Sequence, residues 1–369
     1  MTILLMLAAL SAAYANGAND NFKGVATLLG SGSLRYRGAL LYATLATALG
    51  SVPAIVAGGA LARSFSGRGL VPDALAAEPH FVTAVGGGAA LTVLLAARLG
   101  MPISTTHALL GGLIGSGLAS GAPLEGGALR SSFVYPLLLS PWVALLLTVG
   151  LHPPLRAAAR RLARTPALCV CVGRAEAIAV PGPGGAVLAR SGSDLTTGAL
   201  ETCRAHGARA LLAIRAPALL GPLHLLSAGT VSFARGLNDT PKIAGLIAFG
   251  SLGLGTVGSS LAVGAAMAIG GLMAARRVAE TMSHGITGMT RGQGLSANLA
   301  TSILVVGASV LGLPVSTTHV SVGALFGIGL TGGRARPAAI LEILLAWVVT
   351  LPCAALFAAI LHLLVRRVA

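Results

Sequence analysis

The chain has 369 residues, of which 55% are apolar and 9% are charged, and its formal net charge is +15. A soluble protein of this length needs far more charge to cover its surface, so the composition excludes a soluble globular protein and predicts a multi-pass membrane protein. The arginines are spread over the polar segments between apolar runs instead of forming one basic domain, so a nucleic-acid partner is not expected.

Apolar runs of suitable length for a membrane span recur along the chain. In the N-terminal part they cover residues 2–30, 38–61, 81–99, 102–120 and 133–151. After a polar interval they cover residues 221–250, 253–275, 295–313, 315–330 and 339–365. The predicted fold class is an all-α polytopic membrane protein, and the sequence leaves open whether the hairpin segments span the membrane or re-enter it.

Two motifs occur twice, in the same order, in the two sets of apolar runs. NGANDNFKGV, from residue 16, corresponds to RGLNDTPKIA, from residue 235; PISTTH, from residue 102, corresponds to PVSTTH, from residue 314. This duplication predicts a first membrane repeat over residues 1–151 and a second over residues 221–369. Five apolar runs per repeat is an odd number, so we expect two inverted-topology repeats with broken helices and hairpin tips, as in many secondary transporters.

The arginine distribution also predicts the orientation of the chain. More arginines fall on the side that holds residues 152–220, so this interval is expected in the cytoplasm, with both termini outside. Its sequence predicts a small α+β connector, with two short strands around a Pro/Gly turn over residues 167–189 and a short helix over residues 195–210. Its three cysteines lack a fourth ligand at a suitable spacing, so no metal site is predicted.

Polar and charged residues interrupt the apolar run at the first motif of each half. They are Asn19, Asp20 and Lys23 in the first half and Asn238, Asp239 and Lys242 in the second, and these two lysines are the only ones in the chain. Charges at membrane depth persist only when they are paired or face a polar cavity. Gly17 and Gly236, which precede these residues, and Pro241 in the second motif predict a break in both helices, which exposes carbonyls for a cation and N–H groups for an anion. An Asp–Lys ion pair within each helix is the alternative, but its repetition favours a binding site.

Each second motif places Ser-Thr-Thr after a proline at the start of an apolar run, which is typical of a capped helix N-terminus. The free N–H groups, the hydroxyls and the helix dipole favour an anion there. The candidate anion-binding hydroxyls are those of Ser104, Thr105, Thr106, Ser316, Thr317 and Thr318. The histidines that follow, His107 and His319, are expected to orient the loops, and a role in proton transfer stays open.

These paired motifs, together with RRVAETMSHGITGMTRGQG over residues 276–294, resemble the inorganic phosphate transporter (PiT) family over both predicted repeats. The resemblance implies secondary uptake of phosphate with sodium ions or protons. It implies a phosphate site that includes the six hydroxyls with Lys23, Lys242, Asn19 and Asn238, and a cation site that includes Asp20, Asp239, Asn19 and Asn238. Accessory candidates are His107, His319, Gln293 and Asn298.

Two positions depart from the family pattern. Lys23 stands where the family usually has a small residue, and Asn298 stands where many relatives carry glutamate. One added positive charge and one missing negative charge favour an anion bound without a cation. We therefore expect Lys23 to replace part of a coupling cation and to weaken or abolish sodium dependence, while sulfate stays open as a substrate.

The predicted function is symport of inorganic phosphate across the cytoplasmic (inner) membrane, coupled to Na⁺ or H⁺. A sulfate permease of the same fold is the alternative, and a passive anion channel is a weaker one. The spans show no nucleophile–base set and no metal ligands beyond the residues already assigned, so an enzyme is not expected. No cofactor is expected, the partners are phosphate or sulfate and the lipid bilayer, and a homo-oligomer is left open.

Overall fold

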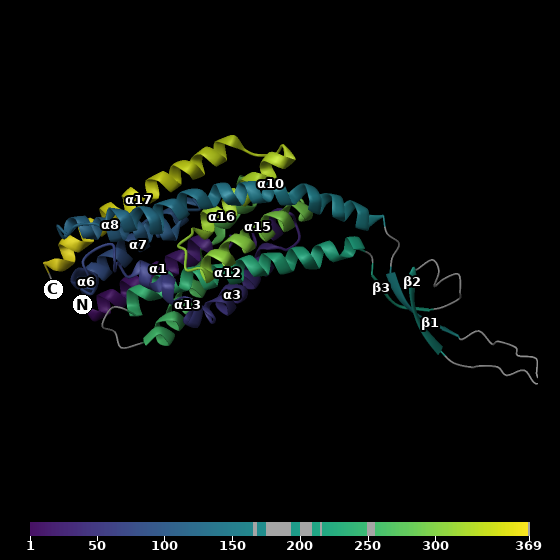
Figure 1. Cartoon of the computed structure of the whole chain (residues 1–369), viewed down its shortest axis with the longest axis horizontal. Coiled ribbons are helices and arrows are strands. Elements are labelled where there is room, and N and C mark those ends of the chain that lie inside the picture. The colour runs from purple at the N-terminus through teal and green to yellow at the C-terminus, as the bar shows by residue number, and fades with distance from the viewer. Residues whose placement is uncertain (165–167, 175–192, 200–208, 215, 249–254, 368–369) are drawn as a thin grey trace, which may run out of the picture. The chain divides into compact units, whose positions relative to one another are not determined.

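The computed structural model describes residues 1–164, 168–174, 193–199, 209–214, 216–248 and 255–367 (Figure 1). These residues are mostly helical, and the chain divides into two compact units. The first unit contains Met1–His152 and His224–Ala369, and the second contains Pro153–Leu223. All four copies of the two motifs belong to the first, helical unit.

The helices of the N-terminal part follow the apolar runs of the sequence. They are α1 (Thr2–Asp20), α2 (Ala26–Gly30), α3 (Tyr36–Ser51), α4 (Ala54–Ala57), α5 (Gly59–Phe65), α6 (Asp73–Ala76), α7 (Pro79–Leu99), α8 (Thr105–Ala119), α9 (Gly126–Ala128), a π-helical turn (Leu129–Val134) and α10 (Tyr135–Ala163). The run 38–61 is not one helix, because α3 ends before Pro53, whose ring cannot continue the helical hydrogen bonds.

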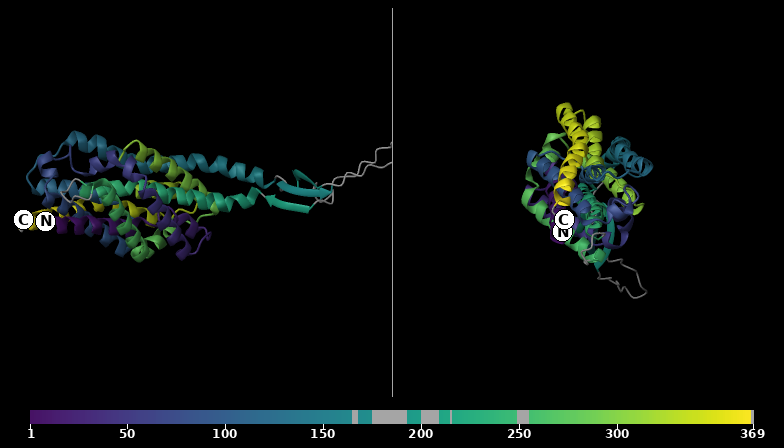
Figure 2. Two further views of the ribbon diagram at one scale, coloured as in Figure 1. Left: turned by 90° about the horizontal axis from the view of Figure 1, so that it is seen from below. Right: turned by 90° about the vertical axis from the view of Figure 1, so that its left-hand side faces the viewer.

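The C-terminal part is also helical. After a 3₁₀ turn (Ala216–Leu219) come α12 (Leu220–Ala248), α13 (Gly255–Ala274), α14 (Arg276–Glu280), a π-helical turn (Thr281–Gly285), α15 (Arg291–Val310), α16 (Thr317–Gly332) and α17 (Pro337–Arg366). Among the described residues, six helical segments are long and apolar enough to cross a membrane: α1, α7, the segment Gly126–Ala163, α13, α15 and α17. The start of α1 and the end of α17 lie at the same end of the helical unit (Figure 1, Figure 2).

The first Asn-Asp-Lys motif contains the predicted helix break. α1 ends at Asp20, and residues 21–25 form turns before α2 begins at Ala26. The turn is closed by backbone hydrogen bonds such as the one from the N–H of Lys23 to the carbonyl of Asp20, at 3.1 Å. Lys23 is therefore held by a turn and not by a regular helix.

The predicted break in the second motif is wrong, because α12 runs through Pro241 without interruption. The side chain of Lys242 donates to the amide oxygen of Asn238, which joins the two ends of the turn that contains the proline. The proline ring also packs against Gly58, where an added Cβ would lie 2.5 Å from the Cβ of Pro241. These contacts support the helix although Pro241 has no N–H to donate.

Glycines bring α1 and α13 into close contact. A Cβ on Gly17 would overlap the backbone carbonyl of Met267, and a Cβ on Gly270 would overlap the carbonyl of Tyr14. This packing keeps the C-terminal end of α1 in the interior, where every residue from Ala15 to Asp20 is buried. The polar end of α1 is therefore positioned by backbone contact between two helices.

Gly17→Ala is expected to destabilise the protein, because the added methyl group has no space beside α13. Overpacking of this kind costs about 1–3 kcal/mol of unfolding free energy. The control is Gly307→Ala in α15, where no atom lies within 4 Å of an added Cβ, and where alanine should raise the stability by about 0.4–1 kcal/mol. Thermal unfolding in detergent compares the two variants, and equal stability would contradict the close contact between α1 and α13.

The second unit contains a three-stranded antiparallel sheet in the order β2–β1–β3. Its strands are β1 (Leu168–Arg174), β2 (Ser193–Ala199) and β3 (Arg209–Ile214). The helix predicted over residues 195–210 is wrong in its first part, because Thr196 and Thr197 pair with β1, and β-branched threonine suits a strand. The next part of that prediction, residues 200–208, and the predicted Pro/Gly turn lie outside the described residues.

Candidate functional site

Five charged side chains among the described residues are buried inside the helical unit, each at most 3% exposed. α1 and the turn after it supply Asp20 and Lys23, and α12 supplies Arg235, Asp239 and Lys242. Three of these groups are cations and two are carboxylates, so one positive charge has no counter-charge among the buried side chains of the described residues. An uncompensated charge in a dry interior is costly, and an added anion would relieve that cost.

Lys23 lies between its own motif and both Ser-Thr-Thr segments. We call residues 101–107 the first tip and residues 313–319 the second tip. The Lys23 ammonium pairs with the carboxylate of Asp20 and donates to the hydroxyl of Thr318 on the second tip. It also donates to the backbone carbonyl of Ile103 on the first tip, at 3.3 Å.

Lys242 makes the equivalent contacts in the other half. Its ammonium lies 3.4 Å from the carboxylate of Asp239 and also donates to the amide oxygen of Asn238. It donates to the hydroxyl of Thr106 on the first tip at 2.9 Å and to the carbonyl of Val315 on the second tip at 2.7 Å. Each lysine therefore contacts both tips, in addition to the ion pair within its own motif.

The two tips also contact each other directly. Thr106 donates to the carbonyl of Val315 at 3.3 Å, and Thr318 donates to the carbonyl of Ile103 at 2.7 Å. Each of these hydroxyls thus accepts from a lysine and donates to the opposite tip. The centroid of the aromatic ring of Phe65 lies 5.8 Å from the Lys242 ammonium.

The aspartates are joined to the threonines that begin α8 and α16. Thr105 donates to Asp20 and Thr317 donates to Asp239, both at 3.3 Å. The amide nitrogen of Asn16 donates to both carboxylates, at 3.0 Å and 3.3 Å. The two halves of the molecule thus share one network, in which a single asparagine connects the two acidic groups.

The serines of the tips act differently from the threonines. The hydroxyl of Ser104 accepts from the N–H of His107 at 3.1 Å, and that of Ser316 accepts from the N–H of His319 at 3.2 Å. Both serines are helix N-caps, so these hydrogen bonds join them to backbone groups of their own helices. Among the predicted phosphate ligands, these two serines do not reach the lysines, because the N-cap position turns their hydroxyls toward the helix.

The two asparagines of the motifs hold neighbouring segments in place. Asn19 donates to the carbonyl of Met101 at 2.8 Å and accepts from the N–H of Ile103 at 3.2 Å, so it fixes the first tip. Asn238 donates to Ser309 at 2.8 Å while its oxygen accepts from Lys242. Both side chains are fully buried.

Two members of the network are absent from the sequence-based prediction. Arg235 donates to the side-chain oxygens of Asn16 at 2.7 Å and of Asn21 and Thr47 at 3.2 Å, and its Nε lies 3.7 Å from Asp239. Asn16 and Arg235 begin the two copies of the first motif and so stand at equivalent positions. An arginine inside an apolar run is itself a signal of a functional site.

The four accessory candidates form no hydrogen bond with the lysines. The rings of His107 and His319 contact each other at a tilt of 42°, with their centroids 4.4 Å apart. Gln293 completes a capping box with Thr290 at the start of α15. Asn298 bonds to Thr27 at 2.9 Å and to Ser227 at 3.2 Å, in a separate buried cluster.

Comparison with known proteins agrees with the arrangement of motifs and helices. The profile of the phosphate transporter family matches residues 16–358. A protein of Pyrococcus abyssi named "putative phosphate permease" is 27% identical over 402 residues, which cover 97% of this chain and 96% of that protein. A protein of Thermococcus kodakarensis with the same type of name is 26% identical over 395 residues, which cover 97% of this chain and 96% of that protein.

A solved structure titled "The sodium-dependent phosphate transporter" has the same fold. Its TM-score is 0.76 at 19% sequence identity, and the match covers 100% of this chain and 99% of that one. The family profile extends over both copies of each motif, from Asn16 to the last helix. The chain therefore belongs to the phosphate transporter family.

Proposed function

We propose that this protein is a secondary transporter of inorganic phosphate, and that its substrate binds between Lys23 and Lys242 at the two tips. The observation that supports this most strongly is the single uncompensated positive charge beside hydroxyls from both tips. The first turns of α8 and α16 add helix N-termini, whose N–H groups and dipoles favour an anion.

Phosphate suits this centre better than sulfate, because the centre contains acceptors as well as donors. Asp20 and Asp239 each accept from neighbouring threonines and from Asn16. At neutral pH phosphate keeps a P–OH group that can donate to a carboxylate, whereas sulfate has no proton to donate. A site built around such a hydrogen bond rejects an analogue that lacks the donor.

Entry of the anion requires the tips to separate. The aspartates, lysines and tip threonines of the centre are at most 5% exposed. The contacts between Lys23 and Thr318 and between Lys242 and Thr106 link the halves of the chain across the centre. The hydroxyls of Thr106 and Thr318 can donate to a bound phosphate instead of to the carbonyls of the opposite tip. Phosphate binding therefore replaces the hydrogen bonds that are lost when the tips separate. We propose that the tip that moves determines the side of the membrane to which the site opens.

The surroundings of the lysines bear on the coupling ion. Each ammonium faces a carboxylate, a hydroxyl and a backbone carbonyl, and oxygens of this kind hold sodium in secondary transporters. We infer that the tethered ammonium groups take the place of transported sodium ions. Of the two coupling ions expected from the family resemblance, this favours the proton.

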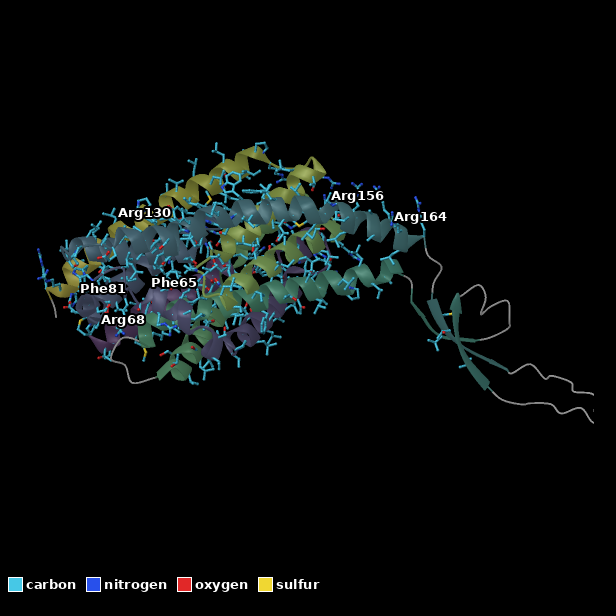
Figure 3. The ribbon with its side chains drawn as sticks, viewed as in Figure 1. Phe65, Arg68, Phe81, Arg130, Arg156 and Arg164 are labelled. Carbon is cyan, nitrogen blue, oxygen red and sulfur yellow. The ribbon has the colours of Figure 1, made fainter. Side chains whose placement is uncertain are left out.

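The apolar segments and the exposed arginines support a proposal for the location of the protein. We place the helical unit in the cytoplasmic membrane with both termini outside, since the ends of α1 and α17 lie together (Figure 2). Arg156, in the C-terminal part of α10, and Arg164, directly after the helix ends at Ala163, are exposed and belong to the basic cluster that we assign to the cytoplasm (Figure 3).

Uptake of radiolabelled phosphate by the purified protein in proteoliposomes tests this proposal. With an inward proton gradient, uptake is expected to continue unchanged when choline replaces sodium, and excess unlabelled sulfate is not expected to compete. A steep sodium requirement would contradict the role of the tethered cations. Faster uptake of sulfate than of phosphate would contradict the substrate.

A further inference from the structure

A cavity of about 590 Å³ lies behind the two tips, between α10 and α17. We call it the tip cavity. Its deep wall includes Leu137, Phe326 and Trp347, each at most 8% exposed. Its mouth includes Trp142, 61% exposed, and Val348, 72% exposed. The cavity therefore runs from the outer surface of two membrane-crossing helices into the packed interior.

The floor of the tip cavity is formed by the tips themselves. His319 is 4% exposed and lines the cavity together with His107. Its ring stacks on Trp347 at 3.8 Å, and neither of its ring nitrogens makes a hydrogen bond of normal geometry within the described residues.

The histidines connect the cavity with the anion site. His107 follows Thr106 directly, and His319 follows Thr318 directly, in the first turns of α8 and α16. The threonine hydroxyls contact the lysines on one side of the tips, while the imidazoles line the cavity on the other. A molecule in the cavity would therefore contact the two histidines that directly follow Thr106 and Thr318.

We propose that the tip cavity binds one acyl chain of a membrane phospholipid and that this chain sets the position of the tips. The mouth is continuous with the lipid-facing surface of α10 and α17, because its side chains are exposed and apolar on two candidate spans. Among the described residues that line the cavity there is no Asp, Glu, Lys or Arg, so an uncharged chain enters while the charged headgroup stays outside. The volume lies within the range of roughly 300–1,000 Å³ found for ligand sites. The regulatory part of this inference rests on the proposed transport function, whereas the binding part does not.

Photo-crosslinking in proteoliposomes tests the binding. The probe is a phosphatidylcholine that carries a diazirine near the end of one acyl chain. Labelling is expected on the α10 segment Leu137–Leu145 and on α17. Val348→Trp, which fills the mouth, should reduce this labelling about tenfold, a usual effect of shape change in an apolar pocket. Val349→Trp is the matched control, since Val349 is also exposed, at 52%, but does not line the cavity.

Phosphate uptake in the same vesicles tests the regulation. Val348→Trp is expected to change the KM for phosphate by about tenfold, while Val349→Trp leaves it unchanged. Equal labelling of both variants would overturn the lipid site. Cross-links between two copies of the chain at the mouth of the cavity, formed without the diazirine lipid, would also overturn it. Reduced labelling with an unaltered KM would overturn the regulatory role. Absence of uptake by the unmodified protein would contradict the proposed transport function. The labelling experiment would still test whether the cavity binds a lipid.

Discussion

Lys23→Ala is expected to make phosphate uptake dependent on sodium ions. Removal of the ammonium leaves a space between the carboxylate of Asp20, the hydroxyl of Thr318 and the carbonyl of Ile103. A free cation can occupy this space and neutralise the carboxylate. In choline medium, uptake should fall by roughly 100-fold or more, because Asp20 loses its closest ion-pair partner and the anion loses one of its cations, and removal of one partner of a buried pair costs about 3–5 kcal/mol. Sodium chloride should restore most of the uptake, which is measured with radiolabelled phosphate in proteoliposomes.

Two variants separate this effect from misfolding. The double variant Asp20→Asn/Lys23→Met removes both charges, so it should elute as a folded protein in size-exclusion chromatography but show no stimulation by sodium. Arg276→Ala removes a cation whose side chain is 79% exposed and should transport normally in choline. Full uptake by Lys23→Ala in choline would contradict a role for this ammonium. A folded Lys23→Ala protein that sodium fails to stimulate would contradict the inference that the oxygens around Lys23 can hold sodium.

The double substitution Thr106→Val/Thr318→Val is expected to raise the KM for phosphate by roughly 100-fold or more. Each substitution keeps the shape of the side chain and removes a hydroxyl that contacts a lysine and the opposite tip. A hydrogen bond to a charged group contributes about 1.5–3 kcal/mol, which corresponds to at least a tenfold change for each hydroxyl. Initial rates of uptake at varied phosphate concentration give the KM.

The serines provide the matched control for the threonines. Ser104→Ala removes the cap of α8 and should lower the stability by about 1 kcal/mol. It should leave the KM unchanged, because the Ser104 hydroxyl caps its own helix and does not contact the lysines. An equal rise in KM for Ser104→Ala and Thr106→Val would contradict this division of roles between neighbouring hydroxyls.

The membrane class and the main residues of the candidate site could be predicted because charge is costly in an apolar run. The two lysines and two aspartates are conspicuous for this reason, and the duplication of both motifs in the same order connects them with the tips. The structure brings Lys23, Lys242, Thr106 and Thr318 into one network. The same reasoning applies to Arg235, whose place in α12 is as costly as that of the lysines and whose equivalence to Asn16 can be read from the motifs.

Other features depend on packing and could not be predicted from a local pattern. Pro241 does not interrupt α12, because the surrounding contacts and the absence of a side chain on Gly58 support the helix. The serines and threonines of the tips have similar chemistry. Their roles differ because the helices begin directly after the serines, so that the serines are N-caps while the threonines point into the network. Gln293 is different: its capping box with Thr290 is visible as Thr-x-x-Gln in the sequence.

The central claim is that both lysines and both tips hold one oxyanion inside the helical unit. The most direct test is an experimental structure of the protein with bound arsenate. Anomalous scattering locates the arsenic atom independently of the protein atoms. We expect arsenate oxygens within about 3 Å of the ammonium groups of Lys23 and Lys242 and of the hydroxyls of Thr106 and Thr318. Arsenate bound elsewhere, with both lysine–threonine contacts intact, would contradict the claim.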